Sequence, residues 1–362
     1  MAFEDKKSSC FHGRKLNIEI FGASHASEIG VVVQGFGGEK VDMQTLQEFL
    51  DRRKPKNTEY STKRLEGDKV IVESGFDGCV LSSPFKAVIK NTEQKSADYQ
   101  NVVKTPRPSH ADYVAWTKYG DNFDYRGGGK FSGRMTAPMC IAGGLCKQIL
   151  KDKGIEINAY ISAIGSVKGR SYSDTDIERI DFAKLDKFFP LLDDGLKMDM
   201  LDEIESARKD CDSVGGVIEC VITGVPVGAG EYMFDSLESV ISSLAFAVPA
   251  VKGIEFGTGF DIVKMRGSTA NDALYYDGQK VKTRTNNNGG INGGMANGMP
   301  ITFRVAIKPT PSIGIEQDSV NLTDKTNVKL KIQGRHDACI TPRAVPVIEA
   351  IASIAMYDSI GK

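Results

Sequence analysis

Three consecutive glycines, Gly127–Gly129, stand in a segment, from Arg107 to Arg134, that also holds three arginines and one of the four histidines. Because a run of glycines costs backbone entropy, a folded protein keeps one mainly where Cβ atoms would obstruct a close approach. Backbone N–H groups flanked by guanidinium groups bind anions, most often phosphate. A helix expected directly afterwards, at 135–153, adds a favourable dipole. The segment therefore predicts a loop that binds a phosphorylated or polyanionic small molecule.

Two histidines in such surroundings are candidates for proton transfer near neutral pH. His110 follows Pro108 within the basic loop and precedes Asp112. His25 lies among small residues that leave its ring reachable, although a turn histidine bonded to the backbone explains the same pattern. Both rings are interpreted as candidate proton donors or acceptors.

A compact charged cluster, Arg335 to Arg343, precedes an apolar segment near the end of the chain. Asp337 stands there among arginines, so it ionises easily and is able to take a proton or orient a ligand. The alternative is a structural ion pair that caps the following helix.

Further donor groups are concentrated in two other segments. Residues 308–312 combine a lysine, a threonine and a serine with two prolines, and residues 286–294 are rich in asparagine and glycine. The second segment also suits an exposed flexible loop. The basic residues at 51–54 suit a solvated helix end as well as a binding site. Together, these segments indicate two anionic ligands, or one ligand with both carboxylate and phosphate groups.

Helical and strand patterns alternate along the whole chain, and no low-complexity linker divides it. We therefore expect an α+β fold in a single domain over 1–362, with residues 1–14 as a mobile extension. The segment 174–194 is expected outside the core. The expected strands are 16–20, 31–33, 70–73, 86–89, 217–222 and 301–307, and the expected helices are 43–53, 135–153, 199–209, 237–246 and 345–360.

Charge and cysteine usage exclude several classes of protein. The net charge is −1, so no basic field favours nucleic acid. The longest apolar run, 244–251, is too short to span a bilayer, and the polar N-terminus lacks the apolar core of a signal peptide. Seven cysteines without a Cys-x-x-Cys pair favour reduced thiols in a cytoplasmic protein, with no metal site. P-loop, Rossmann and zincin motifs are missing from the sequence.

Many short motifs, in this order, resemble the chorismate synthase family over nearly the whole chain. They are Phe21-Gly-Ala-Ser-His25, Asp51-Arg-Arg-Lys-Pro55, Tyr60-Ser-Thr-Lys-Arg64, Asn91-Thr-Glu-Gln-Lys-Ser-Ala-Asp-Tyr99, Arg107-Pro-Ser-His-Ala-Asp112, Arg126-Gly-Gly-Gly-Lys130, Ala250-Val-Lys-Gly253, Asn287-Asn-Gly-Gly-Ile-Asn-Gly-Gly294, Lys308-Pro-Thr310 and Gly334-Arg-His-Asp337. One such motif is weak, but this many in sequence order is specific.

The resemblance implies a layered β-α-β sandwich and a lyase that converts 5-enolpyruvylshikimate-3-phosphate to chorismate and phosphate with reduced FMN. It implies that His25 assists phosphate departure, that His110 protonates the reduced flavin, and that Asp337 helps flavin N5 accept the C6 proton. The implied flavin contacts are Lys130, Ser132, Ala250, Gly293, Lys308, Thr310, Ser312 and Arg335. The implied substrate contacts are Arg53, Arg107 and Arg134.

By the same resemblance we expect a cytoplasmic homotetramer in the shikimate pathway of aromatic amino-acid biosynthesis. Some family members reduce their flavin with NADPH. The modest length here favours an external flavin reductase as a partner. The departures from the family pattern are Ala23, Ala26, Glu59, residues 81–83, Lys130 and Met135. Because the candidate catalytic residues remain, we expect activity. The alternatives are an inactive homologue that still binds flavin and, with little support, a nucleic-acid binder.

Overall fold

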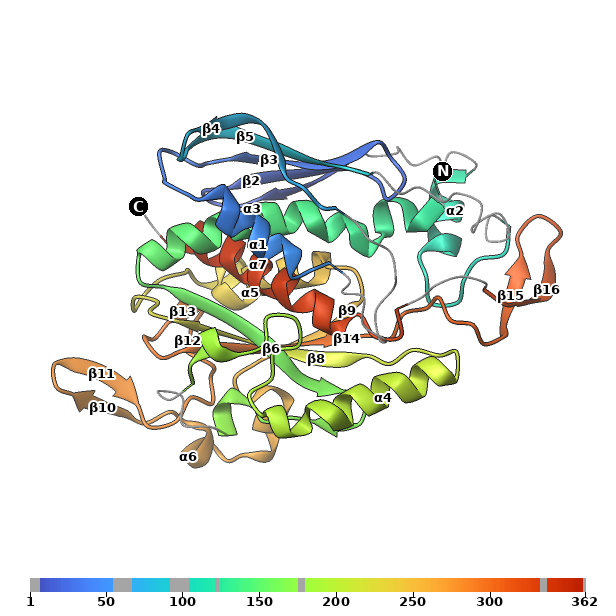
Figure 1. Cartoon of the computed structure of the whole chain (residues 1–362). Coiled ribbons are helices and arrows are strands. Elements are labelled where there is room, and N and C mark those ends of the chain that lie inside the picture. Colours follow the sequence, from blue (N-terminus) through green and yellow to red (C-terminus); the bar gives the residue numbers. More distant parts are fainter. Residues whose placement is uncertain are drawn as a thin grey trace.

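Two antiparallel sheets enclose a layer of helices in the computed structural model, which describes residues 7–54, 67–91, 104–120, 124, 126–174, 180–332 and 337–360 (Figure 1). The first sheet has the order β1 (Ser8–His12), β2 (Asn17–Gly22), β3 (Glu28–Gln34), β5 (Val80–Lys90) and β4 (Ile71–Asp77). The second has the order β7 (Val167–Lys168), β6 (Glu156–Ile164), β8 (Gly216–Thr223), β14 (Ile301–Ile307) and β9 (Val251–Phe256). The expected α+β fold with β-α-β layers is confirmed.

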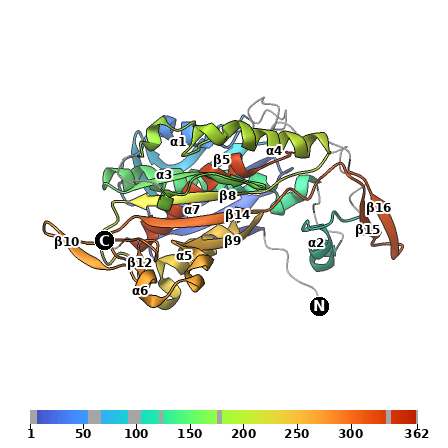
Figure 2. The same cartoon turned by 90° about the horizontal axis from the view of Figure 1, so that it is seen from below.

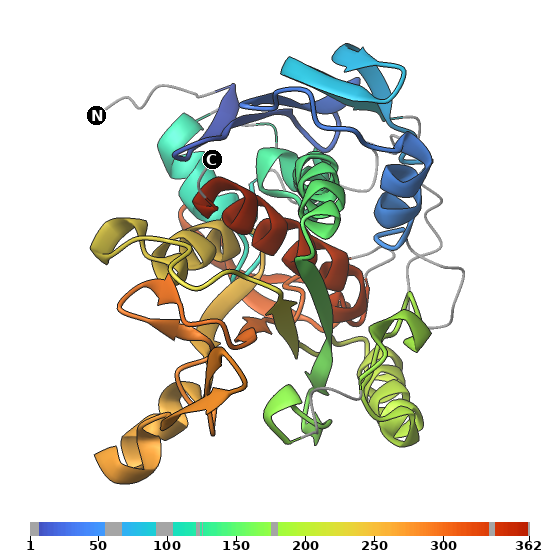
Figure 3. The same ribbon diagram turned by 90° about the vertical axis from the view of Figure 1, so that its left-hand side faces the viewer.

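The helical layer contains α3 (Thr136–Asp152) and α7 (Thr341–Ser359), which pack on each other between the sheets (Figure 3). Helix α3 contacts β3 and β5 of the first sheet, and α7 contacts β6 and β8 of the second. Helices α1 (Met43–Asp51) and α5 (Leu237–Ala247) pack against α3 and α7 respectively. The apolar sequence of α7 thus has a direct cause, because the helix is surrounded on all sides.

Small residues in α3 permit this close packing. A Cβ atom on Gly143 would lie 2.4 Å from the Cβ of Ala350 on α7. A Cβ atom on Gly144 would lie 2.6 Å from Leu46 on α1. Replacing either glycine would therefore push two helices apart.

The remaining elements lie around the sandwich (Figure 2). They are α2 (Asp112–Tyr119), α4 (Lys197–Lys209), α6 (Gly267–Ala270) and three hairpins, β10 (Leu274–Asp277) with β11 (Lys280–Thr283), β12 (Ile291–Asn292) with β13 (Met295–Ala296), and β15 (Gln317–Asn321) with β16 (Thr326–Leu330). Among the described residues, no helix is long and apolar enough to cross a bilayer.

The expected helices and strands occur with boundaries shifted by a few residues. Helix α1 begins as predicted, because the side chain of Asp42 accepts a hydrogen bond from the Thr45 N–H group. The expectation for 174–194 is wrong in part. Phe189 and Leu191 are buried in the main core, where their apolar side chains outweigh the polar composition of the segment. Residues 175–179 lie outside the described part.

The N-terminal segment also differs from the expected extension. Residues 8–12 form β1, which pairs with β2 along its whole length. The Asp358 carboxylate accepts hydrogen bonds from the backbone N–H groups of Arg14, Lys15 and Leu16. Residues 1–6 are outside the described part of the chain.

Candidate functional site

The triple glycine brings the two candidate histidines together. Gly127, Gly128 and Gly129 all have positive φ values, of 58°, 83° and 54°. A Cβ atom on Gly127 would lie 2.7 Å from Nε2 of His25, and one on Gly128 would lie 3.4 Å from Nε2 of His110. The positive φ favours glycine at all three positions, and the close approach of the His25 ring additionally requires it at Gly127. The two rings lie against neighbouring residues of one loop. This loop ends directly before η4 (Gly133–Met135), which leads into α3.

His110 belongs to a buried ionic cluster at the start of α2. Its Nδ1 atom lies 2.6 Å from Oδ1 of Asp112 and 3.0 Å from Nη2 of Arg107. Arg107 also donates to Asp112 from Nε at 2.7 Å and from Nη2 at 2.8 Å. Burial alone would raise the pKa of Asp112, but hydrogen bonds from Arg107 and His110 hold the pKa well below its usual 3.8. An ionised Asp112 favours a proton on Nδ1 and fixes the ring orientation.

Residues 308–312, which follow β14, contact the ionic cluster around His110. Arg107 Nη1 donates to Ser312 Oγ at 3.0 Å, and Lys308 Nζ donates to the Ser109 carbonyl at 2.5 Å. Ala250 has a positive φ of 75° and accepts a hydrogen bond from the Lys308 N–H group at 2.9 Å. Burial and the nearby charge of Lys252 lower the pKa of Lys308. The end of β14 and the start of β9 therefore present a cation beside His110.

Asp337 lies on the same side, just before α7. Thr310 Oγ1 donates to the Asp337 carbonyl at 2.9 Å, which links this residue to the segment after β14. Oδ2 of Asp337 lies 2.6 Å from Nη1 of Arg343 on α7, so the ion pair considered from the sequence is present. Arg343 in turn donates from Nε to the Arg53 carbonyl at 2.9 Å.

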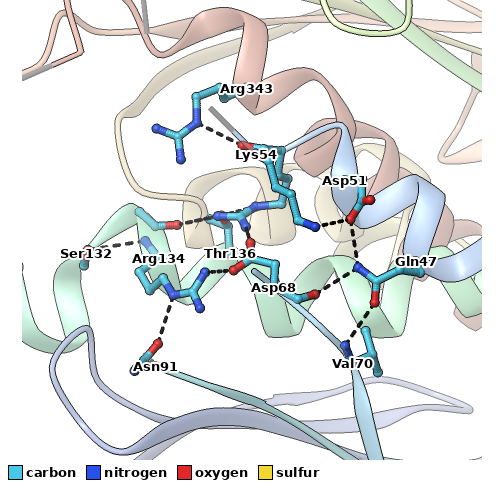
Figure 4. Close-up of polar contacts among 12 residues, drawn as sticks. Gln47, Asp51, Lys54, Asp68, Val70, Asn91, Ser132, Arg134, Thr136 and Arg343 are labelled. Carbon is cyan, nitrogen blue, oxygen red and sulfur yellow. Dashed lines mark hydrogen bonds and ion pairs between the residues drawn. The ribbon is translucent and has the colours of Figure 1, made fainter. Parts of the chain in front are cut away.

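The predicted substrate arginines Arg53 and Arg134 meet at one carboxylate, that of Asp68 (Figure 4). Arg53 Nη1 lies 3.1 Å from Oδ2 of Asp68, and Arg134 Nη1 donates to Oδ1. Burial would raise the pKa of Asp68, but the charges of Arg53 and Arg134 lower it. Asn91 continues the chain of contacts, since it accepts from Arg134 Nε at 3.1 Å and donates to the Ala26 carbonyl at 2.8 Å beside His25.

Two more predicted flavin contacts lie in the glycine loop. Ser132 caps η4 through a 3.3 Å hydrogen bond from the Arg134 N–H group. Lys130 Nζ lies 3.8 Å above the ring of Tyr119 on α2. Met135, one of the departures from the family pattern, precedes α3 and packs against the core.

The structure thus brings together twelve predicted site residues, which we call the basic cluster. They are His25, Arg53, Arg107, His110, Lys130, Ser132, Arg134, Ala250, Lys308, Thr310, Ser312 and Asp337. Gly293 is not among them: it lies in the turn between β12 and β13, on the side of the molecule away from α2 in Figures 1 and 2. Arg335 is outside the described residues, as are motif residues 60–64 and 92–99 and the departure Glu59.

Sequence reasoning missed Asp68 and gave Asp112 no role of its own. Asp112 carried a usable signal, because it stands two residues from His110 and five from Arg107. Asp68 carried none, because its partners are 15 and 66 residues away.

Fold and site together define a layered α+β protein with two histidines, buried carboxylates and several basic side chains at one end of its helical layer. Comparison of the sequence with known families assigns the chain to one of them. The sequence model of the family described as chorismate synthase matches residues 16–360. The chain belongs to the chorismate synthase family.

Individual relatives support this assignment over nearly the full length. Proteins named chorismate synthase from Korarchaeum cryptofilum and Thermococcus gammatolerans are 40% and 41% identical, and each alignment covers 96% of both chains. One from Lachnoclostridium phytofermentans is 42% identical over 96% of this chain and 93% of its own. A crystal structure of a chorismate synthase has the same fold, with a TM-score of 0.72 at 22% identity, covering 96% of this chain and 92% of that one.

Proposed function

We propose that the protein is a lyase that eliminates phosphate from 5-enolpyruvylshikimate-3-phosphate to give chorismate in the shikimate pathway. The observation that carries this proposal is the contact of His25 and His110 with adjacent glycines of one loop. Arg107 contacts His110, and Lys308 donates to the carbonyl of the preceding residue, Ser109. Arg134 is linked through Asn91 to Ala26, next to His25, and Arg53 meets Arg134 at Asp68. A substrate with two carboxylates and a phosphate needs this number of cations.

The elimination combines a poor leaving group with a weakly acidic C–H bond. In this proposal His25, which is buried beside Gly127, protonates the departing phosphate. Arg53, Arg107 and Arg134 bind the anionic groups of the substrate. Asp337 assists removal of the C6 proton, and Arg343 keeps its carboxylate in place. His110, whose ring Asp112 orients through Nδ1, is the proton donor for the cofactor.

Reduced FMN, when bound, would supply electron density for cleavage of the allylic C–O bond. The donor groups of the basic cluster fit its phosphate, because an anion beside Lys308 offsets the cost of burying that ammonium group near Lys252. Thr310 and Ser312 add hydroxyl groups in the same segment. Gly293 lies in the turn between β12 and β13, which is away from α2 in Figures 1 and 2, so within one chain it does not extend this set of donor groups.

The same proposal includes a cytoplasmic homotetramer and an external flavin reductase in place of an intrinsic NADPH-dependent activity. Large exposed apolar side chains support self-association. Phe234 is 92% exposed and Phe260 is 79% exposed, and an isolated chain would leave both in water. Light scattering of the purified protein tests the tetramer.

An anaerobic assay tests the reaction. Purified protein is mixed with substrate and dithionite-reduced FMN, and phosphate and chorismate are measured. We expect both products with reduced FMN and neither with oxidised FMN. His25→Ala and His110→Ala are expected to abolish turnover and to retain FMN binding. An inactive homologue would bind FMN and form no product with the wild-type chain. Added NADPH, in place of dithionite, tests for intrinsic flavin reduction.

A further inference from the structure

Asp68 connects two of the three buried arginines of the basic cluster, Arg53 and Arg134. Its side chain is 1% exposed, and those of Arg53 and Arg134 are 5% and 7% exposed. Arg53 follows α1, whereas Arg134 lies in η4 before α3, so the carboxylate joins two separate elements. Two guanidinium groups within reach of one carboxylate repel each other strongly in a buried position unless that carboxylate is present.

Arg53 also has fixed partners on its other side. It donates from Nε to Thr136 Oγ1 at 3.2 Å and from Nη2 to the Gly133 carbonyl at 3.3 Å. Together with the Asp68 contact, these bonds use three of the five N–H groups of the guanidinium among the described residues. Two N–H groups remain for a ligand anion, in directions set by the three bonds already made.

The side chain of Gln47 on α1 makes two hydrogen bonds to the backbone at and just after Asp68 (Figure 4). Its Nε2 donates to the Asp68 carbonyl at 3.0 Å, and its Oε1 accepts from the Val70 N–H group at 3.0 Å. The same Nε2 lies 2.8 Å from the Asp51 carboxylate, which fixes the amide orientation. Asp68 has a positive φ of 38°, a conformation that a residue with a Cβ atom keeps only when its surroundings impose it.

We propose that Asp68 is a positioning residue, held in place by Gln47, that aligns Arg53 and Arg134 toward one anionic group of the substrate. This inference rests on the proposed function and identifies the residue that keeps the arginines of its anion-binding site in position. The rigid attachment to α1 distinguishes it from the opposite role, in which Asp68 is an internal anion that substrate displaces. The two roles predict opposite changes in affinity when the charge of Asp68 is removed.

The test compares Asp68→Asn and Gln47→Met with Gln44→Met. Gln44 is an exposed glutamine on the same helix whose side chain donates to Glu48, also exposed. Calorimetry measures the Kd of 5-enolpyruvylshikimate-3-phosphate with oxidised FMN present, and separately the Kd of FMN. We expect Asp68→Asn to raise the substrate Kd about tenfold or more. Gln47→Met is expected to raise it about threefold, and Gln44→Met to leave it unchanged. The Kd of FMN should stay within about twofold in all three variants.

An unchanged or lower substrate Kd in Asp68→Asn would overturn the proposal, and so would an equal loss of FMN and substrate binding. Steady-state kinetics add a second readout, since misaligned arginines should raise KM more than they lower kcat. If Asp68→Asn does not fold, Gln47→Met decides, because it retains all three charged groups. If the wild-type chain does not bind the substrate, the proposed function fails. Binding of inorganic phosphate then tests Asp68 alone, with weaker binding in both variants expected.

Discussion

Gly127 lies directly against the imidazole of His25, so that a Cβ atom on Gly127 would be 2.6 Å from Cδ2 and 2.7 Å from Nε2 of the ring. Atoms do not approach so closely, and the positive φ of 58° adds strain for any other residue. The bare backbone at this position therefore sets where the His25 ring lies.

Gly127→Ala should consequently displace His25 from its position. We expect kcat to fall about 100-fold or more, and the free energy of unfolding to fall by about 1 kcal/mol. Steady-state assays and chemical denaturation measure the two effects. Gly133→Ala is the matched control in the next turn, because a Cβ atom there meets no heavy atom within 4 Å and φ is not positive. Equal activities of the two variants would contradict this account of the loop.

Asp112 orients His110 and Arg107 together, and its lowered pKa keeps it ionised. Asp112→Asn removes the negative charge and replaces one acceptor oxygen by an NH2 group. That group cannot accept a hydrogen bond from Arg107 or His110. We expect kcat to fall about 10- to 100-fold because the His110 ring loses its fixed orientation. Rapid-quench measurement of phosphate release gives the rate. Asp318→Asn, at a side chain 88% exposed, is the control. A full-rate Asp112→Asn enzyme would exclude an orienting role for this carboxylate.

Local sequence patterns predicted the elements but not how they meet. The helix expected at 43–53 is α1, and the features that define it, the cap at Asp42 and an apolar face, are short-range ones. The segment around Phe189 was misjudged, because two apolar residues in a polar stretch bury themselves when a nearby surface accepts them. Periodicity reports average composition and does not identify such single anchors.

The candidate site shows the same limit. His25 and His110 were identified separately by their neighbours, but the 84 residues between them carry no signal that both rings lie beside adjacent glycines. For Gly293 the resemblance and the fold disagree. The resemblance groups Gly293 with the flavin contacts, but within one chain it lies between β12 and β13, away from α2 (Figure 1). Glu349, within the apolar pattern of α7, was overlooked because its partners lie on α3 and just beyond α1.

Glu349 is a buried carboxylate at the centre of the helical layer, with a side chain 3% exposed. It accepts from Arg52 Nη1 at 2.7 Å and Nη2 at 2.8 Å, and it also pairs with Lys147. Burial would raise its pKa, but the two cations outweigh burial and lower the pKa from 4.5 to about 2. A carboxyl group whose pKa is lower in the folded state stabilises the fold above its unfolded pKa and loses that contribution as the pH falls.

Glu349→Gln should therefore destabilise the protein in a pH-dependent manner. At pH 7 the free energy of unfolding should fall by about 3 kcal/mol, since one carboxylate no longer balances two buried cations. The difference from wild type should stay constant down to about pH 5 and shrink between pH 4.5 and about 2, where the wild-type carboxyl protonates. Urea denaturation at successive pH values measures both curves, with Asp202→Asn on the exposed face of α4 as the control. If the two curves of unfolding free energy against pH stayed parallel over this range, the ionised form of Glu349 would not stabilise the protein. Only a carboxyl group that protonates in this range makes the two curves converge.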